Sequence, residues 1–188
     1  MMLDTDEVQA VRCLKNGDIG GLELLIARYQ DKALRMAFLV TQDEPLAEDV
    51  VQDAFVRFFL RVSGFDEARP FEPYFLRSVG NNALNALQRE NKGNYPMGQE
   101  THALEALLDQ AASVEEQVEF NALKQKILEA LSILAPRQRA VIVQRYYLQM
   151  SEEEMSAALD APRGTVKWLL HAARERLRSL LGSERMSE

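Results

Sequence analysis

Cysteine, histidine, glycine and proline are scarce in this chain, and long hydrophobic runs are absent. Cys13 is the single cysteine among 188 residues. It can form neither an internal disulfide nor a zinc site shared among cysteines, so we interpret it as a small apolar helix residue. The longest apolar run, Met36–Val40, has five residues, whereas a membrane span needs roughly 18. The acidic N-terminus has no apolar signal segment. We therefore expect a cytoplasmic protein without membrane insertion.

Catalytic and metal-binding patterns are also missing from the sequence. The only two histidines, His102 and His171, have no partners at metal-ligand spacing. No glycine-rich loop could cradle a phosphate, and no nucleophile is paired with a base. We expect no metal, no cofactor and no enzymatic activity.

Charge is distributed unevenly along the chain. The net charge is −7, which by itself argues against a nucleic-acid partner. Residues 163–181, however, hold five Arg and Lys residues against Glu175 alone, a net charge of +4. Such asymmetry indicates different partners for the acidic front of the chain and its basic end.

Helical periodicity dominates the pattern, and strand-like alternation is almost absent. We predict helices near 5–15, 19–41, 44–63, 71–91, 117–134, 136–149, 151–159 and 162–182. The polar stretch after Asn91, with two glycines and one proline, marks a linker. The expected fold is all-α: two small helical domains, residues 1–92 and 117–188, joined by a flexible linker over 93–116.

The last two predicted helices have the outline of a helix-turn-helix. Ser151 and Glu154 form a capping box, and Pro162 suits the start of the next helix after a three-residue turn. In that helix an apolar stripe is predicted to be buried: Val166, Leu170, Ala173 and Leu177. A second stripe could follow a DNA backbone: Lys167, His171, Arg174 and Arg178. The alternative is a solvated basic helix end that complements its own dipole.

These segments resemble a known family. Residues 134–139, 141–146, 150–155, 164–167 and 171–177 are similar to region four of bacterial sigma factors of the extracytoplasmic-function type. Residues 47–55, and 71–77 with Asn81, are similar to region two. The resemblance covers most of residues 20–92 and 117–181. It implies an alternative sigma factor, which binds core RNA polymerase and directs promoter recognition and transcription initiation.

The resemblance assigns the polymerase contact to one face of the predicted helix 44–63. Four acceptor-rich side chains share that face: Glu48, Asp49, Gln52 and Asp53. Such a face suits Arg and Lys residues of a partner, which the family implies is the clamp coiled coil of the large polymerase subunit. The alternative is a solvated acidic face. Val50, Val51, Ala54, Phe55 and Phe58 can face the core.

The resemblance assigns promoter melting and the downstream element to the predicted helix 71–91 and the loop before it. Aromatic rings could stack on unpaired bases, amides could bond base edges, and cations could meet phosphates. Without the family these aromatics would be interpreted as core. The residues are Phe65, in the loop where the family holds a flipped-out base, with Tyr74, Phe75, Arg77, Asn81, Asn85, Arg89 and Lys92. Tyr74 replaces the usual Trp of the family, and Asn85 replaces a frequent Asp.

Upstream-element binding falls on the last helix. The DNA-binding residues implied are Arg163, Thr165, Lys167, Trp168, His171, Arg174 and Arg178. Trp168, Leu169 and Ala172 stand where the family often has polar or basic residues, so they form an apolar cluster beside the reading stripe. We expect either that Trp168 is covered by the N-terminal domain or by an inhibitor, or that it packs within its own domain. The family implies an anti-sigma factor as such a partner.

Two other functions remain open from the sequence. A stand-alone helix-turn-helix regulator would not need the face that carries Glu48 and Asp53. A polymerase-binding protein that has lost promoter reading would bind the polymerase but start no transcripts, and Leu169 and Ala172 keep this alternative open.

Overall fold

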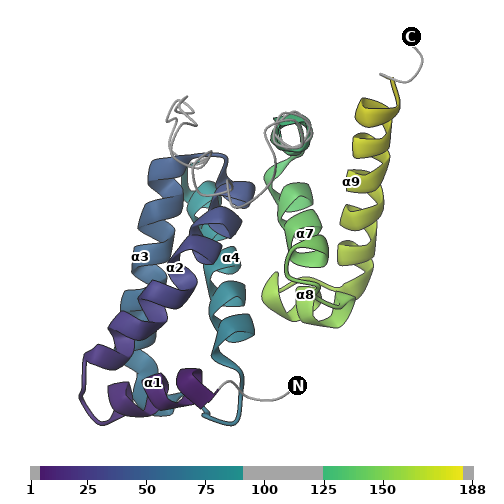
Figure 1. Ribbon diagram of the computed structural model, residues 1–188. Coiled ribbons are helices and arrows are strands. Elements are labelled where there is room, and N and C mark those ends of the chain that lie inside the picture. Colours follow the sequence, from purple (N-terminus) through teal and green to yellow (C-terminus); the bar gives the residue numbers. More distant parts are fainter. Residues whose placement is uncertain (1–4, 91–124, 184–188) are drawn as a thin grey trace.

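The N-terminal half is a helical bundle whose helices the sequence largely predicts. The computed structural model describes residues 5–90 and 125–183. Helices α2 (Gly20–Thr41), α3 (Glu44–Arg61) and α4 (Phe71–Glu90) pack against one another, and α1 (Thr5–Lys15) packs against α2 at the lower end of the bundle (Figure 1). Gly21 allows a close α1–α2 contact, since a Cβ atom at this position would lie only 2.2 Å from the Ala10 carbonyl oxygen. The predicted linker and the helix start at 117 lie outside the described residues.

Aromatic residues fill the centre of this bundle. Phe55 of α3 lies against Phe75 of α4, with ring centroids 4.3 Å apart. Phe58 meets Phe71 edge to face at 4.7 Å. Edge-to-face and offset ring pairs contribute about 0.5–1.5 kcal/mol each beyond the area that they bury. The aromatic residues of α3 and the first turns of α4 therefore hold these two helices together.

The C-terminal half contains the predicted helix-turn-helix. A helical segment over residues 125–132 precedes α7 (Pro136–Tyr146), α8 (Glu152–Ala158) and α9 (Arg163–Ser183). The capping box of α8 is confirmed: the Glu154 amide donates to the Ser151 hydroxyl at 3.2 Å, and the Ser151 amide donates to the Glu154 carboxylate at 2.9 Å. The tight turn between α8 and α9 places Asp160 at a φ of 46°.

Several predicted helices run one to three residues past their ends in the structure. Helix α7 ends at Tyr146 rather than at 149, because Gln149 has a φ of 53° and the Met150 amide donates back to the Gln144 carbonyl. Helix α3 ends at Arg61, and the 3₁₀ helix η1 (Val62–Gly64) replaces its last turn. The all-α fold is confirmed, and the described residues contain no strand.

The two halves touch along α2, α4 and α7. Arg77 Nη2 of α4 donates to Glu154 Oε1 of α8 at 2.8 Å. The Tyr147 hydroxyl lies 3.4 Å from the Lys32 carbonyl oxygen of α2. A cleft of about 510 Å³ runs between the halves beside these contacts. No helix in the described part of the chain is both long and apolar enough to span a membrane.

Candidate nucleic-acid interface

The predicted polymerase face lies on the outside of α3. Its four residues are all exposed, whereas Val50, Val51 and Ala54, between them in the sequence, are buried. This division follows from the helical period, which places the apolar residues of α3 toward α2 and α4. Asp53 also pairs with Arg57 one turn later, at 2.6 Å. The exposed residues of this face are Glu48, Asp49, Gln52 and Asp53.

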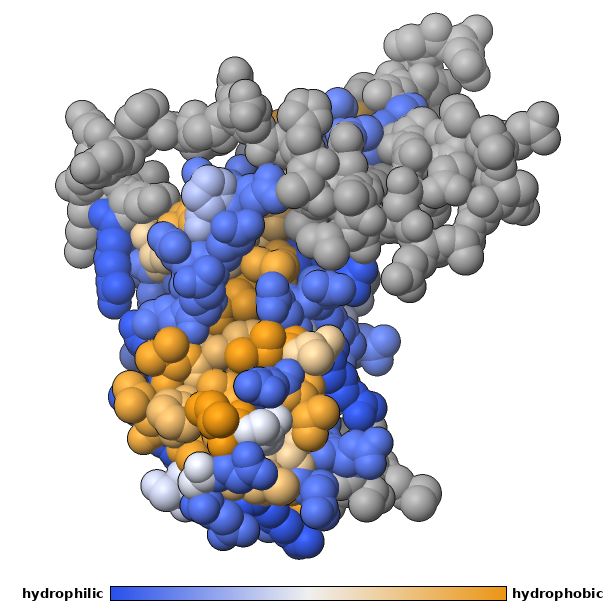
Figure 2. Space-filling model, turned by 60° about the vertical axis from the view of Figure 1, so that its left-hand side comes forward, coloured by the Kyte–Doolittle hydropathy of each residue, from blue (hydrophilic) through white to orange (hydrophobic). Residues whose placement is uncertain are grey.

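The same face continues into apolar residues that the sequence analysis did not identify. Val56 and Leu60 follow Asp49 and Asp53 at helical spacing, and Leu60 is 72% exposed. Phe59 is also exposed beside them. Figure 2 brings the left-hand side of Figure 1, where α3 lies, forward and shows hydrophobic residues gathered in the lower half of that view. The missed signal was an apolar pair, Val56 and Leu60, out of phase with the buried stripe of α3.

A shallow hollow joins this face to predicted promoter-contacting residues of α4. It has a volume of about 210 Å³, and its lining includes Asp49 and Asp53 from α3 with Asn85 and Arg89 from α4. The fold therefore brings two predicted groups together at one edge of the bundle, where both Asn85 and Arg89 are exposed.

Phe75 is a correction to the predicted stacking residues. Only 1% of it is exposed, because its ring packs between Phe55 and Phe71 in the core. It cannot stack on an unpaired base without unpacking the bundle, so the core interpretation is the right one for this residue. Tyr74, one position earlier, is 42% exposed, so part of this side chain is in reach of solvent.

Phe65 is also packed rather than free. Its ring lies 5.5 Å from Phe58 and 4.9 Å from Tyr74. Only 9% of Phe65 is exposed, so its ring is not open to a base in this arrangement.

The loop before α4 is held in place by α1. Arg12 Nε and Lys15 Nζ donate to the Glu67 carboxylate at 2.7 and 3.1 Å, and the hydrogen bond from Arg12 lowers the pKa of Glu67. The buried Glu7 accepts the Phe71 amide, the first of α4, and the Tyr29 hydroxyl at 2.5 Å. Burial and this carboxylate raise the pKa of Tyr29. Sequence reasoning missed Glu7, because an acidic residue in a first helical turn is ordinarily exposed.

Arg77 and Asn81 lie on the side of α4 that faces the C-terminal half. Arg77 makes the ion pair with Glu154, and Asn81 follows one turn later. The Arg77 Nε and Asn81 Oδ1 atoms are buried and have no hydrogen-bond partner among the described residues. A buried polar group without a partner costs about 1–3 kcal/mol. The two halves therefore meet over polar atoms that lack a hydrogen-bond partner while the halves are in contact.

The basic residues of α9 are exposed along its outer surface, and several are held by neighbours. Lys167 Nζ lies 3.7 Å from Glu152 of α8, and Arg178 pairs with Glu175. Arg174 Nε donates to the Tyr146 hydroxyl at 3.0 Å, with the guanidinium over the ring of that tyrosine. Arg163 and His171 are exposed, and Thr165 is half-buried.

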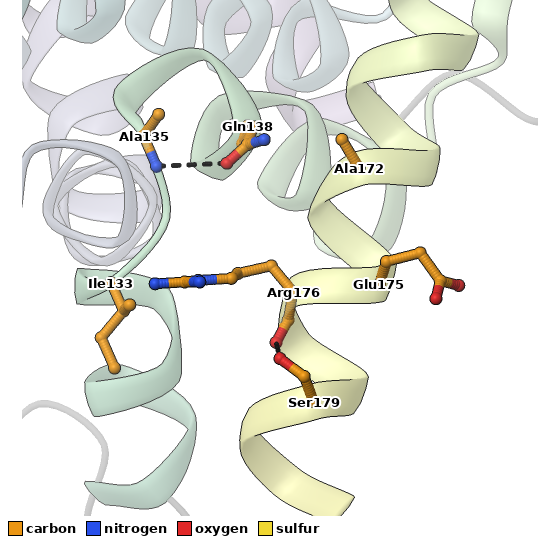
Figure 3. Close-up of a pocket in the computed structure, with 7 residues that line it drawn as sticks. All are labelled: Ile133, Ala135, Gln138, Ala172, Glu175, Arg176 and Ser179. Carbon is orange, nitrogen blue, oxygen red and sulfur yellow. Dashed lines mark hydrogen bonds between the residues drawn. The ribbon is translucent and has the colours of Figure 1, made fainter.

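Leu169 does not belong to the predicted exposed cluster with Trp168. Leu169 is only 6% exposed and belongs to the core with the buried Val166 and Leu170. Ala172 lines a different hollow, of about 550 Å³, between α9 and residues 133–138, across which Arg176 extends (Figure 3). The helical period explains the burial of Leu169, which lies about 100° around α9 from Trp168 toward the core, whereas Ala172 follows Trp168 by one turn on the same side.

Trp168 remains exposed on α9. It is 64% exposed although the two halves are in contact. The predictions that it packs within its own domain or is covered by the N-terminal domain are therefore wrong for this arrangement. In the part of the chain that the structure describes, no group of three His, Cys, Asp or Glu residues could hold a metal; His102 lies outside that part.

Comparisons with known proteins agree with the two regions. The model of sigma-70 region 2 matches residues 25–93, and that of sigma-70 region 4 matches residues 124–177. The chain is 36% identical over 170 residues to an RNA polymerase sigma-E factor of Streptomyces avermitilis, which covers 90% of each chain. It is 31% identical over 180 residues to the ECF RNA polymerase sigma-E factor of Escherichia coli K12, which covers 91% of each.

Two solved structures share the fold. CnrH, in complex with the cytosolic domain of CnrY, matches with a TM-score of 0.60 and 22% identity over 95% of this chain and 98% of that one. The sigma factor RpoE of Bartonella quintana, in complex with the anti-sigma factor NepR, matches with a TM-score of 0.62 and 20% identity over 85% and 96%.

Proposed function

The chain belongs to the sigma-70 family, as an alternative sigma factor of the extracytoplasmic-function group, and from this premise we propose which surfaces bind polymerase and DNA. The exposed face of α3 docks on the clamp coiled coil of core RNA polymerase. Helix α4 contacts the opened downstream element, and α9 reads the upstream element.

The exposed stripe of α3 is the observation that carries the docking assignment. Asp49 and Asp53 offer carboxylates to Arg and Lys residues of a partner, and Val56 and Leu60 extend the stripe with apolar surface. Interfaces commonly combine an apolar centre with a charged rim. A stand-alone DNA-binding regulator would gain nothing from such a stripe on the side of the bundle away from α9.

Tyr74, Asn85 and Arg89 are the DNA contacts of α4 that the structure leaves accessible. The phenol ring can stack on a base, the amide can bond a base edge, and the guanidinium can meet a phosphate. Arg77 and Asn81 become available only when the C-terminal half moves away from α4. The free chain is therefore partly closed, and binding to polymerase and DNA requires it to open.

We assign no chemical step to this chain. It binds and opens promoter DNA within the polymerase, which performs the synthesis, and it acts in the cytoplasm where the polymerase is. The cleft between the halves, lined by Lys32, Tyr147 and Glu154 among others, would admit a segment of an anti-sigma factor, which would hold the chain closed.

A binding experiment with core polymerase tests the docking surface. Reversing Asp49 and Asp53 to Lys should weaken binding at least tenfold, because two carboxylates of the interface become cations facing cations. The matched control reverses Asp31 and Glu129, two exposed carboxylates elsewhere, so that the net charge changes equally. Equal affinity of both variants for core polymerase would contradict the assignment.

A further inference from the structure

We propose that Trp168 reads the 5-methyl group of a thymine in the upstream promoter element, and so sets the sequence specificity of α9. This inference rests on the proposed function, which places α9 in the major groove of promoter DNA. It concerns a position at which this chain has Trp168, whereas the family often has a polar residue.

Trp168 occupies the outermost side of the reading helix. Val166, Leu170 and Ala173 are buried and define the side of α9 that faces the core. Trp168 lies two residues after Val166, which is about 200° around the helix at about 100° per residue. Its 64% exposure agrees with that position. When the second helix of a helix-turn-helix enters a major groove, the side opposite its core meets the base edges.

An open notch lies one turn before Trp168. Gly164 precedes Trp168 by four residues and so shares its side of the helix. Apart from its two chain neighbours, no side chain of the described residues, the indole included, lies within 4 Å of the place that a Cβ atom would take on Gly164. A base edge can therefore approach the backbone at Gly164 and meet the indole beside it.

Polar and basic side chains stand to one side of Trp168 rather than on the same line. Lys167 and His171 are exposed next to it, and Arg174 is held against Tyr146 further along the helix. These groups suit phosphates, which fix the register of the helix without reading sequence. The base-reading position is thus left to an apolar ring.

The chemistry of the major groove selects the base. Among the four bases, thymine alone presents an apolar group there, its 5-methyl group, beside the O4 acceptor. An indole offers apolar surface to the methyl group, and its Nε1–H can donate to an acceptor such as O4. Contact between the two removes both apolar surfaces from water, which favours binding.

Selection of promoters by the reconstituted holoenzyme tests this inference. Core polymerase with the full chain selects upstream elements from a randomised duplex pool, and the selection is repeated with Trp168→Ala and with Ile133→Ala. Ile133 is a comparably exposed apolar residue of the same half, outside α8 and α9. The wild-type and Ile133→Ala elements should share a thymine at one or two adjacent positions, and Trp168→Ala should lose that preference alone.

Replacing the selected thymine with deoxyuridine removes only the methyl group. Wild-type holoenzyme should bind the substituted promoter about fourfold more weakly, the effect expected for one buried carbon. Trp168→Ala should bind both promoters equally, and Trp168→Phe should restore part of the difference. Deoxyuridine at thymines outside the element should change neither.

Three results would overturn the inference. The selected element could lack thymine, Trp168→Ala could select the same element, or the variant could keep the full sensitivity to the methyl group. Unchanged selection together with loss of binding to an anti-sigma protein would show that this side of α9 docks a protein instead. Failure of the wild-type holoenzyme to select any upstream element would refute the proposed function itself, and this inference with it.

Discussion

The ion pair between Arg77 and Glu154 should control how often the two halves separate. Its side chains are 38% and 46% exposed, and exposed pairs contribute about 0.2–1 kcal/mol. Removing it should therefore raise the ratio of open to closed chains by a factor of about 1.4 to 5. Glu154→Gln is the suitable change, because glutamine at this position can still complete the capping box of α8. Glu153→Gln, in the same turn, is the control.

Distance measurements between the halves provide the assay. Spin labels at two exposed positions, Gln30 of α2 and Ala157 of α8, are placed in a Cys13→Ser background. Glu154→Gln should increase the population of long distances, and Glu153→Gln should leave it unchanged. Combining Glu154→Gln with Arg77→Gln should add little, since each change removes the same pair. Identical distributions in all variants would refute the idea that this pair holds the halves together.

The pH dependence of closure follows from the Glu154 carboxylate. Hydrogen bonds from the Ser151 amide and hydroxyl, and then Arg77, lower the pKa of Glu154. The Ser151 hydrogen bonds lie within α8 and persist when the halves separate, so only the Arg77 contribution favours closure, and it is lost as the pH falls through the lowered pKa. The distance distribution should therefore stay constant from about pH 8 to pH 6 and shift only in more acidic solution.

Three further predictions concern the N-terminal half. NMR titration should give Glu67 a pKa below that of an unperturbed glutamate, and Arg12→Gln should raise it; an unchanged value would show that the pair does not form in solution. Glu7→Gln should lower the free energy of unfolding by about 1–3 kcal/mol in urea denaturation, because a buried acceptor of two hydrogen bonds is impaired. Phe75→Ala should cost about 3–5 kcal/mol, whereas Tyr74→Ala, at a half-exposed ring, should cost clearly less and reduce promoter opening; equal losses of stability would contradict the assignment of Phe75 to the core.

Local signals in the sequence predicted the helices well. The apolar stripe of α9 and the capping box of α8 depend on residues within one or two helical turns. They can therefore be recognised in the sequence without knowledge of the tertiary packing. Chain turns at residues with a positive φ were harder to predict from the sequence. Gln149, just after the end of α7, has a positive φ, which a glutamine in the sequence does not predict. The predicted helix therefore continued to this residue.

Whether a residue faces the core or the solvent was harder to predict than which helix it belongs to. Phe75 and Tyr74 are adjacent aromatics in a helix of mixed pattern, and the packing of Phe75 against Phe55 and Phe71 decides which of them is buried. Contacts between distant segments were not predictable at all. Neither the Glu7 acceptor for α4 nor the pairing of Arg77 with Glu154 leaves a periodic trace in the sequence, since each depends on how whole helices pack.

Transcription in vitro tests the central claim most directly. Core polymerase is incubated with a library of promoter duplexes, with this chain, with its Asp49→Lys, Asp53→Lys variant or with no addition, and run-off transcripts are sequenced. The account predicts transcripts from a defined set of promoters with the wild-type chain, and loss of that set with the docking variant. A chain that binds core polymerase but starts no transcripts, or a docking variant that starts the same transcripts, would contradict it.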